Sequence, residues 1–148
     1  MQTGKYLSSL VSGNIPMQFL PVILFILGSA MAFSTGTSWG TFGIMLPIAA
    51  AMAANAAPEL LLPCLSAVMA GAVCGDHCSP VSDTTILSST GAKCNHIDHV
   101  TTQLPYAATV ATATSIGYIV VGFTYSGLAG FAATAVSLIV IVFAVKKR

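Results

Sequence analysis

Charged residues are scarce in this sequence. Only 6% of its 148 residues are Asp, Glu, Lys or Arg, whereas 55% are hydrophobic and the mean hydropathy is +0.88. A water-soluble globule needs more polar side chains than this to cover its surface. The formal net charge of +1 leaves no basic surface for nucleic acid. The composition therefore excludes a soluble globular protein and predicts an all-α integral membrane protein that is surrounded by the lipid bilayer.

The sequence also lacks the common motifs of enzymes. No HExxH, GxSxG or P-loop pattern occurs anywhere along it. We therefore expect no enzymatic activity, no catalytic residues and no cofactor.

Only two apolar runs are long enough for ordinary membrane spans. A bilayer core of about 30 Å needs about 20 helical residues to cross it. Near the C-terminus two such runs flank the short turn TYSG, so we predict transmembrane helices over residues 101–123 and 128–145. The basic tail of Lys146, Lys147 and Arg148 predicts a cytoplasmic C-terminus in a multi-pass protein of the cell membrane.

The first half contains two shorter apolar arms, residues 17–33 and 42–54, with the polar stretch STGTSWGT between them. As helices the arms are roughly 25 and 20 Å long, and the second is too short to span a bilayer. We therefore predict a re-entrant helical hairpin over residues 17–54, with its polar tip inside the membrane. Irregular backbone is tolerated at that depth where it is buried in protein or lines a wet cavity. A pair of ordinary short spans remains the alternative.

The stretch CGDHCSPVSDTT, residues 74–85, concentrates polar groups in a chain that has few of them. The apolar residues before it predict a helix that starts near Pro63 and stops at Asp76, about 18 Å later and near the middle of the bilayer. The chain then resumes as a polar-faced helix, with Ser79 as its N-cap and Pro80 as its first residue. This pattern predicts a discontinuous membrane helix over residues 60–92.

A broken membrane helix offers an ion site, because carbonyl groups are unpaired at one end and N–H groups at the other. Asp76 adds a carboxylate where carbonyl oxygens gather, which suits a hard cation. A carboxylate in a low-dielectric site also holds protons tightly, so it binds either a proton or a cation. We predict Asp76 and Asp83 as the shared carriers. The remaining side chains of the expected cation and proton site are Thr35, Thr37, Ser38, His77, Ser79, Ser82 and Thr84.

Each of these residues also has a purely structural interpretation. Asp83 in a first helical turn complements the helix dipole. His77 is either a proton carrier or a satisfied interior histidine. The hydroxyl groups of serine and threonine commonly bond to carbonyls within their own membrane helix. Asp76 has no comparable structural explanation.

Zinc binding is the rival chemistry for the polar residues. The spacing of the thiols and imidazoles matches no strong zinc motif. Two of the cysteines are expected at membrane depth and the other ligands at the surface, so we expect no metal site. The side chains concerned are Cys74, His77, Cys78, Cys94, His96 and His99.

Two longer strings connect the chain to a known family. The strings STGTSWGTFGIMLPIA, residues 34–49, and GDHCSPVSDTTILSS, residues 75–89, resemble the C-terminal half of the NhaC-type sodium/proton antiporter family. The likeness extends from about residue 17 to 125. It implies a transporter of two inverted repeats, each with a re-entrant hairpin and a broken helix that meet at a central cation site. Sodium and protons are then transported ions, with the residue 35–38 and 76–85 runs as the two halves of the site.

The resemblance implies sodium/proton antiport, and it also leaves two other functions open. Members of the family include exchangers of organic acids or amino acids, so proton- or sodium-coupled exchange of such solutes is one alternative. A membrane interaction protein that does not transport is the other. Because residues 1–148 correspond to a single repeat, we expect a second, N-terminal repeat on the same chain or on a partner, and no transport by this chain alone. Association with further copies of the chain is left open.

Overall fold

A computed structural model describes residues 16–146, and residues 1–15 and 147–148 lie outside the described part. Of the basic tail, only Lys146 is therefore described. All regular structure in residues 16–146 is helical, in agreement with the expected all-α class. The elements are η1 (Met17–Phe19), α2 (Leu20–Thr35), α3 (Ser38–Ala56), η2 (Pro58–Leu60), α4 (Leu61–Cys78), α5 (Asp83–Gly91), α6 (His96–Thr124) and α7 (Gly127–Lys146).

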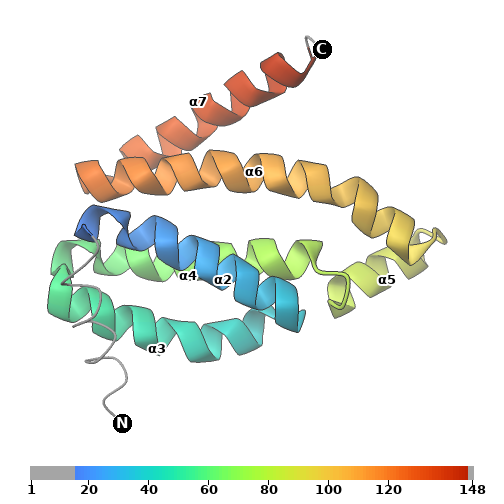
Figure 1. The fold of residues 1–148 in the computed structure, drawn as a ribbon, viewed down its shortest axis with the longest axis horizontal. Helices are drawn as coiled ribbons and strands as arrows, with labels where there is room; N and C mark the ends of the chain where they lie inside the picture. The colour runs from blue at the N-terminus through green and yellow to red at the C-terminus, as the bar shows by residue number, and fades with distance from the viewer. Residues whose placement is uncertain (1–15, 147–148) are drawn as a thin grey trace.

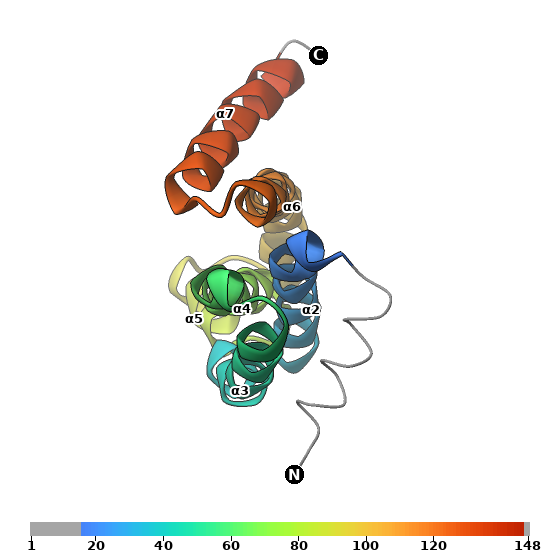
Figure 2. The same cartoon turned by 90° about the vertical axis from the view of Figure 1, so that its left-hand side faces the viewer.

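The helices α2, α3 and α4 form a compact group, and α6 lies across it (Figure 1). The helices α2 and α4 run in the same direction, whereas α3 and α6 run in the opposite direction. Seen end-on, α7 lies on the far side of α6 and points away from the group (Figure 2). The C-terminal ends of α2 and α4 therefore lie at the same end of the molecule, where α3 and α5 begin.

Glycine residues let α2 and α4 pack with their backbones in contact. A Cβ atom on Gly71 would collide with the Phe25 carbonyl oxygen, and one on Gly75 would collide with the Ser29 carbonyl oxygen. From the other side, a Cβ on Gly28 would lie 3.3 Å from the Val68 carbonyl oxygen. Small residues four apart are the usual means of close helix approach in membranes.

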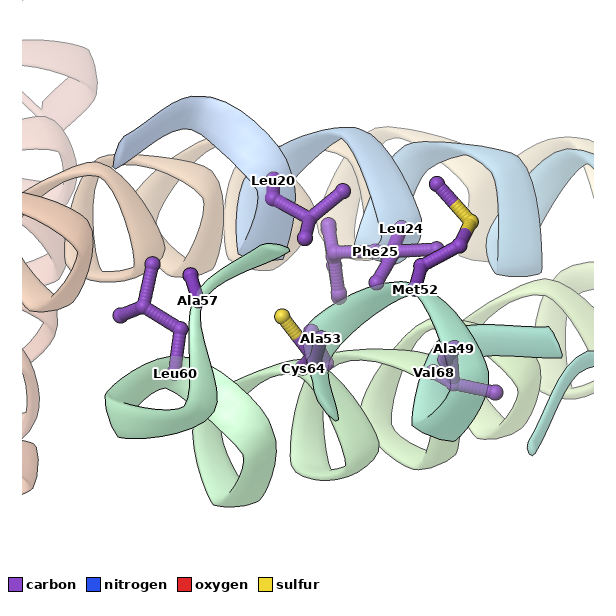
Figure 3. Close-up of a cluster of buried hydrophobic side chains, with 11 residues drawn as sticks. Leu20, Leu24, Phe25, Ala49, Met52, Ala53, Ala57, Leu60, Cys64 and Val68 are labelled. Carbon is purple, nitrogen blue, oxygen red and sulfur yellow. The ribbon is translucent and has the colours of Figure 1, made fainter. Parts of the chain in front are cut away.

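The buried apolar core lies between these three helices (Figure 3). The helices α3 and α4 pack against each other, and both small alanines and larger side chains fill the space between them. The core is formed by Leu20, Leu24, Phe25, Ala49, Met52, Ala53, Ala57, Leu60, Cys64, Ala67 and Val68.

Four helical segments are long and apolar enough to cross a membrane, which confirms the expected membrane class. They are Met17–Thr35, Pro58–Cys78, His96–Thr124 and Gly127–Lys146. The helix α3, which contains Pro47, is not among these segments of the described residues. The re-entrant path over residues 17–54 stays a prediction.

The link between α2 and α3 is shorter than the polar stretch suggested. Ser34 and Thr35 complete α2, and α3 already begins at Ser38, so only Gly36 and Thr37 connect the helices. Thr37 is the N-cap of α3, and its Oγ1 accepts a hydrogen bond from the Gly40 amide at 3.3 Å. This cap draws residues 38–41 into the helix and corrects the expected loop over residues 34–41.

Replacing Gly75 by alanine should force α2 and α4 apart, because the added Cβ has no space beside the Ser29 carbonyl. Overpacking of this kind costs about 1–3 kcal/mol. Gly43→Ala is the matched control, since no other described atom lies within 4 Å of a Cβ at that position of α3. Denaturation of the two purified variants should show a clear loss of stability for Gly75→Ala and none for Gly43→Ala. Equal stability of the two would contradict the packing described here.

Candidate ion-binding site

The two interruptions of the helical structure touch each other. Gly36 has a φ of 66°, and a Cβ there would lie 2.8 Å from the Val81 carbonyl oxygen, so the link between α2 and α3 lies directly against the break between α4 and α5. The buried Ser79 hydroxyl donates a hydrogen bond to the Phe33 carbonyl oxygen at 2.7 Å. That carbonyl is in the last turn of α2, where the helix itself offers no donor. A side chain from the break thus caps the end of α2.

Four helix termini consequently meet at one place. The helices α2 and α4 end there and contribute partly negative carbonyl groups, while α3 and α5 begin there and contribute partly positive N–H groups. Such a place favours a cation near the first pair and an anion near the second.

Asp76 and two hydroxyl groups form a hydrogen-bonded chain at this place. Ser82 Oγ donates to Asp76 Oδ1 at 2.7 Å, and Ser82 Oγ and Thr84 Oγ1 are 2.8 Å apart. Since Ser82 has one proton and gives it to the carboxylate, Thr84 is the donor in the second bond. Ser82 is buried, whereas Asp76 is half-buried. One carboxylate and two hydroxyls are thereby within reach of a single small ion.

The break itself differs in detail from the sequence-based expectation. The helix α4 does not stop at Asp76 but continues to Cys78, so the carboxylate projects from its last turn. The helix α5 begins at Asp83, not at Pro80, and the preceding residue is Ser82. Ser79 N–H bonds to the Asp76 carbonyl, and its hydroxyl is taken by α2. The Ser79 hydroxyl also accepts a hydrogen bond from the Val81 amide at 3.3 Å, but α5 begins only at Asp83, so Ser79 is not its N-cap.

A carbonyl group in the last turn of α4 accepts hydrogen bonds from side chains of α5 and α6. The His77 carbonyl oxygen accepts hydrogen bonds from Thr85 Oγ1 at 3.2 Å and from Gln103 Nε2 at 2.9 Å. Both of its lone pairs are used, so this carbonyl is not available to an ion. Gln103 was not singled out by the sequence, because its partner lies 26 residues away and on another helix.

A polar cavity of about 310 Å³ opens beside the site. Thr84 belongs both to the hydrogen-bonded chain and to the cavity wall, so the cavity lies next to the site. Its lining residues are His77, Thr84, Thr85, Ser88, His99 and Gln103.

Other predicted site residues have different roles in the described structure. Thr35 donates to the Met31 carbonyl within α2 at 3.0 Å, and Thr37 caps α3, so their hydroxyls serve helix ends. Asp83 is exposed in the first turn of α5, and the His77 side chain is exposed at the end of α4. Ser38 begins α3 and is half-buried. Within residues 16–146, no three Asp, Glu, His or Cys side chains are grouped as a metal site.

Sequence comparison places the chain in a known family of transporters. Residues 1–123 match the Na+/H+ antiporter family, and the chain belongs to it. This family consists of transporters and is not a class of enzymes. Together with four apolar helices, membership identifies a multi-pass membrane protein.

Three individual proteins are similar to the chain. An uncharacterised protein of Haemophilus influenzae is 98% identical over the whole chain, which covers 28% of that protein. The malate-2H+/Na+-lactate antiporter of Bacillus subtilis is 40% identical over 116 residues, 76% of this chain and 24% of the relative. An uncharacterised Na+/H+ antiporter of Haemophilus influenzae is 34% identical over 132 residues, 76% of this chain and 26% of the relative. The chain spans about a quarter of the length of these relatives, and no solved structure matches it.

Ser79→Ala tests the contact between the two interruptions. The change leaves the Phe33 carbonyl without its donor in a buried place, which costs about 1–3 kcal/mol. Ser34→Ala is the control, because the Ser34 hydroxyl is exposed and bonds only to the Ala30 carbonyl of its own helix. Thermal denaturation should show a lower midpoint for Ser79→Ala than for Ser34→Ala. If both variants melt like the unchanged protein, Ser79 does not hold the two interruptions together.

Proposed function

We propose that this chain forms the C-terminal repeat of a secondary transporter that exchanges sodium for protons. The observation that carries the proposal is the chain of hydrogen bonds from Asp76 through Ser82 to Thr84, placed where four helix ends meet. Membership of the Na+/H+ antiporter family supports the ions chosen.

The arrangement suits an ion that has shed its water. Sodium is a hard cation and prefers oxygen ligands, and Asp76 Oδ2 accepts no hydrogen bond from residues 16–146. The hydroxyl oxygens of Ser82 and Thr84 keep lone pairs free for an ion while they donate their protons. A proton on Asp76 would remove the negative charge that holds the cation. Sodium and proton therefore compete for one carboxylate, and this competition couples their movements.

The rest of the transporter is part of the proposal. We place residues 17–54 as a re-entrant hairpin and residues 60–92 as a broken helix, and the second, inverted repeat on the same chain or a partner chain closes the cavity around them. The relatives, of which this chain covers only 24–28%, are consistent with such a repeat. We place the transporter in the cell membrane with the C-terminus of this chain in the cytoplasm, since its last residues are basic.

The decisive test is exchange by the assembled transporter, meaning this chain together with the second repeat, in sealed vesicles. Asp76→Asn should abolish proton movement driven by a sodium gradient, because the amide holds neither the proton nor the positive charge. Asp98→Asn is the matched control, since Asp98 is exposed in the first turn of α6. Asp83→Asn should weaken exchange if Asp83 is the second carrier. Full exchange by Asp76→Asn at equal protein levels would remove Asp76 from the mechanism.

A second function is favoured by one of the relatives, the malate-2H+/Na+-lactate antiporter of Bacillus subtilis. An organic acid needs a site for its carboxylate, and the first turn of α3 contains no acidic residue to repel one. The amides of Ser38 and Trp39 at this helix end suit an anion. By contrast, α5 begins with the carboxylate of Asp83.

Uptake measurements separate the two functions. If the assembled transporter exchanges organic acids, vesicles should take up labelled lactate or malate when a sodium or proton gradient is applied. A sodium/proton antiporter should move protons in response to sodium with no added acid and should take up neither label. Proton flux recorded in the same vesicles is the control. Vesicles that show neither flux would favour the interaction protein that does not transport.

A further inference from the structure

His96 is the first residue of α6, and its ring reaches two other parts of the chain. Nε2 lies 2.7 Å from the Pro80 carbonyl oxygen, and Nδ1 lies 3.1 Å from Ser89 Oγ. Ser89 is buried near the end of α5, and Pro80 belongs to the break between α4 and α5. One imidazole thus joins the start of α6 to the break before α5 and to the last turn of α5.

The partners of the ring determine how it is protonated. A carbonyl oxygen only accepts hydrogen bonds, so Nε2 carries a proton and donates it to Pro80. Ser89 either donates to Nδ1 or donates to the Ile86 carbonyl, 2.9 Å away, and accepts from a protonated Nδ1. In both states the bond to Pro80 is kept.

His96 bonds to the peptide group between Pro80 and Val81, which lies in the middle of the break between α4 and α5. The proline ring fixes φ of Pro80, so the direction of its carbonyl depends on ψ alone. On the other side of the same peptide, the Val81 amide donates to Ser79 Oγ at 3.3 Å. Hydrogen bonds therefore hold both sides of the Pro80–Val81 peptide. This restricts the position of Ser82, which follows Val81 and bonds to Asp76.

We propose that His96 is a positioning residue of the ion site. It fixes the Pro80 peptide and thereby presents the Ser82 hydroxyl to Asp76, without touching the ion itself. The inference rests on the proposed function, because it assigns His96 to the sodium affinity of the same site. A purely structural histidine would affect how well the protein folds and leave the affinity for sodium unchanged.

The test measures sodium affinity directly in the purified assembled transporter. Sodium that binds the folded state raises the melting temperature, and the rise grows with the logarithm of the sodium concentration once that concentration exceeds Kd, so a fit of the rise against sodium concentration gives Kd. Loss of a residue that orients an ion ligand typically weakens affinity about 10–100-fold. We expect a rise of that size in the fitted Kd for sodium in His96→Ala and in His96→Phe, which keeps a ring of similar size but neither hydrogen bond.

His96→Gln is the rescue variant, because its amide nitrogen replaces Nε2 as the donor to Pro80. It should remain within about threefold of the unchanged transporter, the effect of a fraction of one hydrogen bond. Thr101→Val, on the next turns of α6, is the neutral control, since Thr101 bonds only within its helix. Unchanged sodium affinity in His96→Phe, or an equal loss in His96→Gln, would overturn the inference. An unchanged transporter that sodium does not stabilise at all would instead overturn the proposed function, and the inference with it.

Discussion

The close approach of α2 to α4 is the constraint on which the rest of the structure depends. Gly71 and Gly75 allow the α4 backbone to lie on the carbonyl groups of α2, a distance that no larger residue permits. Because both helices run in the same direction, this contact brings their C-terminal ends together. If α2 moved outward by the width of a methyl group, Ser79 would lose the Phe33 carbonyl and Gly36 would leave Val81. The packing of two apolar helices thus decides where the polar residues are.

Helix ends inside a membrane are costly because their backbone groups have no water to bond with. Several of the free groups here have a protein partner: Ser79 serves the end of α2, Thr37 serves the start of α3, and Thr85 and Gln103 serve the end of α4. The hydroxyl groups needed for capping outnumber those that face Asp76. Three hydroxyl groups, those of Ser79, Thr37 and Thr85, thus serve helix ends, whereas Ser82 bonds to the carboxylate and Thr84 bonds to Ser82.

The sequence predicts the helical class and the polar regions, but it does not predict which partners the polar residues bond to. A carboxylate followed by Ser-Pro within an apolar stretch indicates an interruption near Asp76, since composition and proline act locally. It does not reveal that Ser79 bonds to α2 and leaves the N-cap position to Ser82, because the partner is 46 residues away. The same applies to Gln103 and His96, whose partners are backbone carbonyls. Every residue has a backbone carbonyl group, so the sequence does not show which carbonyl accepts a given hydrogen bond.

The site is also poised between two sets of hydrogen bonds. Asp76 accepts a hydrogen bond from Ser82, which in turn accepts one from Thr84, so the negative charge is spread over a short polar chain. A cation at Asp76 uses lone pairs that this chain leaves free, whereas a proton neutralises the carboxylate and weakens the bond from Ser82. The two occupants therefore favour different strengths of the contact that connects α4 to α5. In the proposed mechanism, a break that bonds to a backbone carbonyl of α2 and to side chains of α6 can pass such a change to both helices, as the coupling of ion exchange to movement requires.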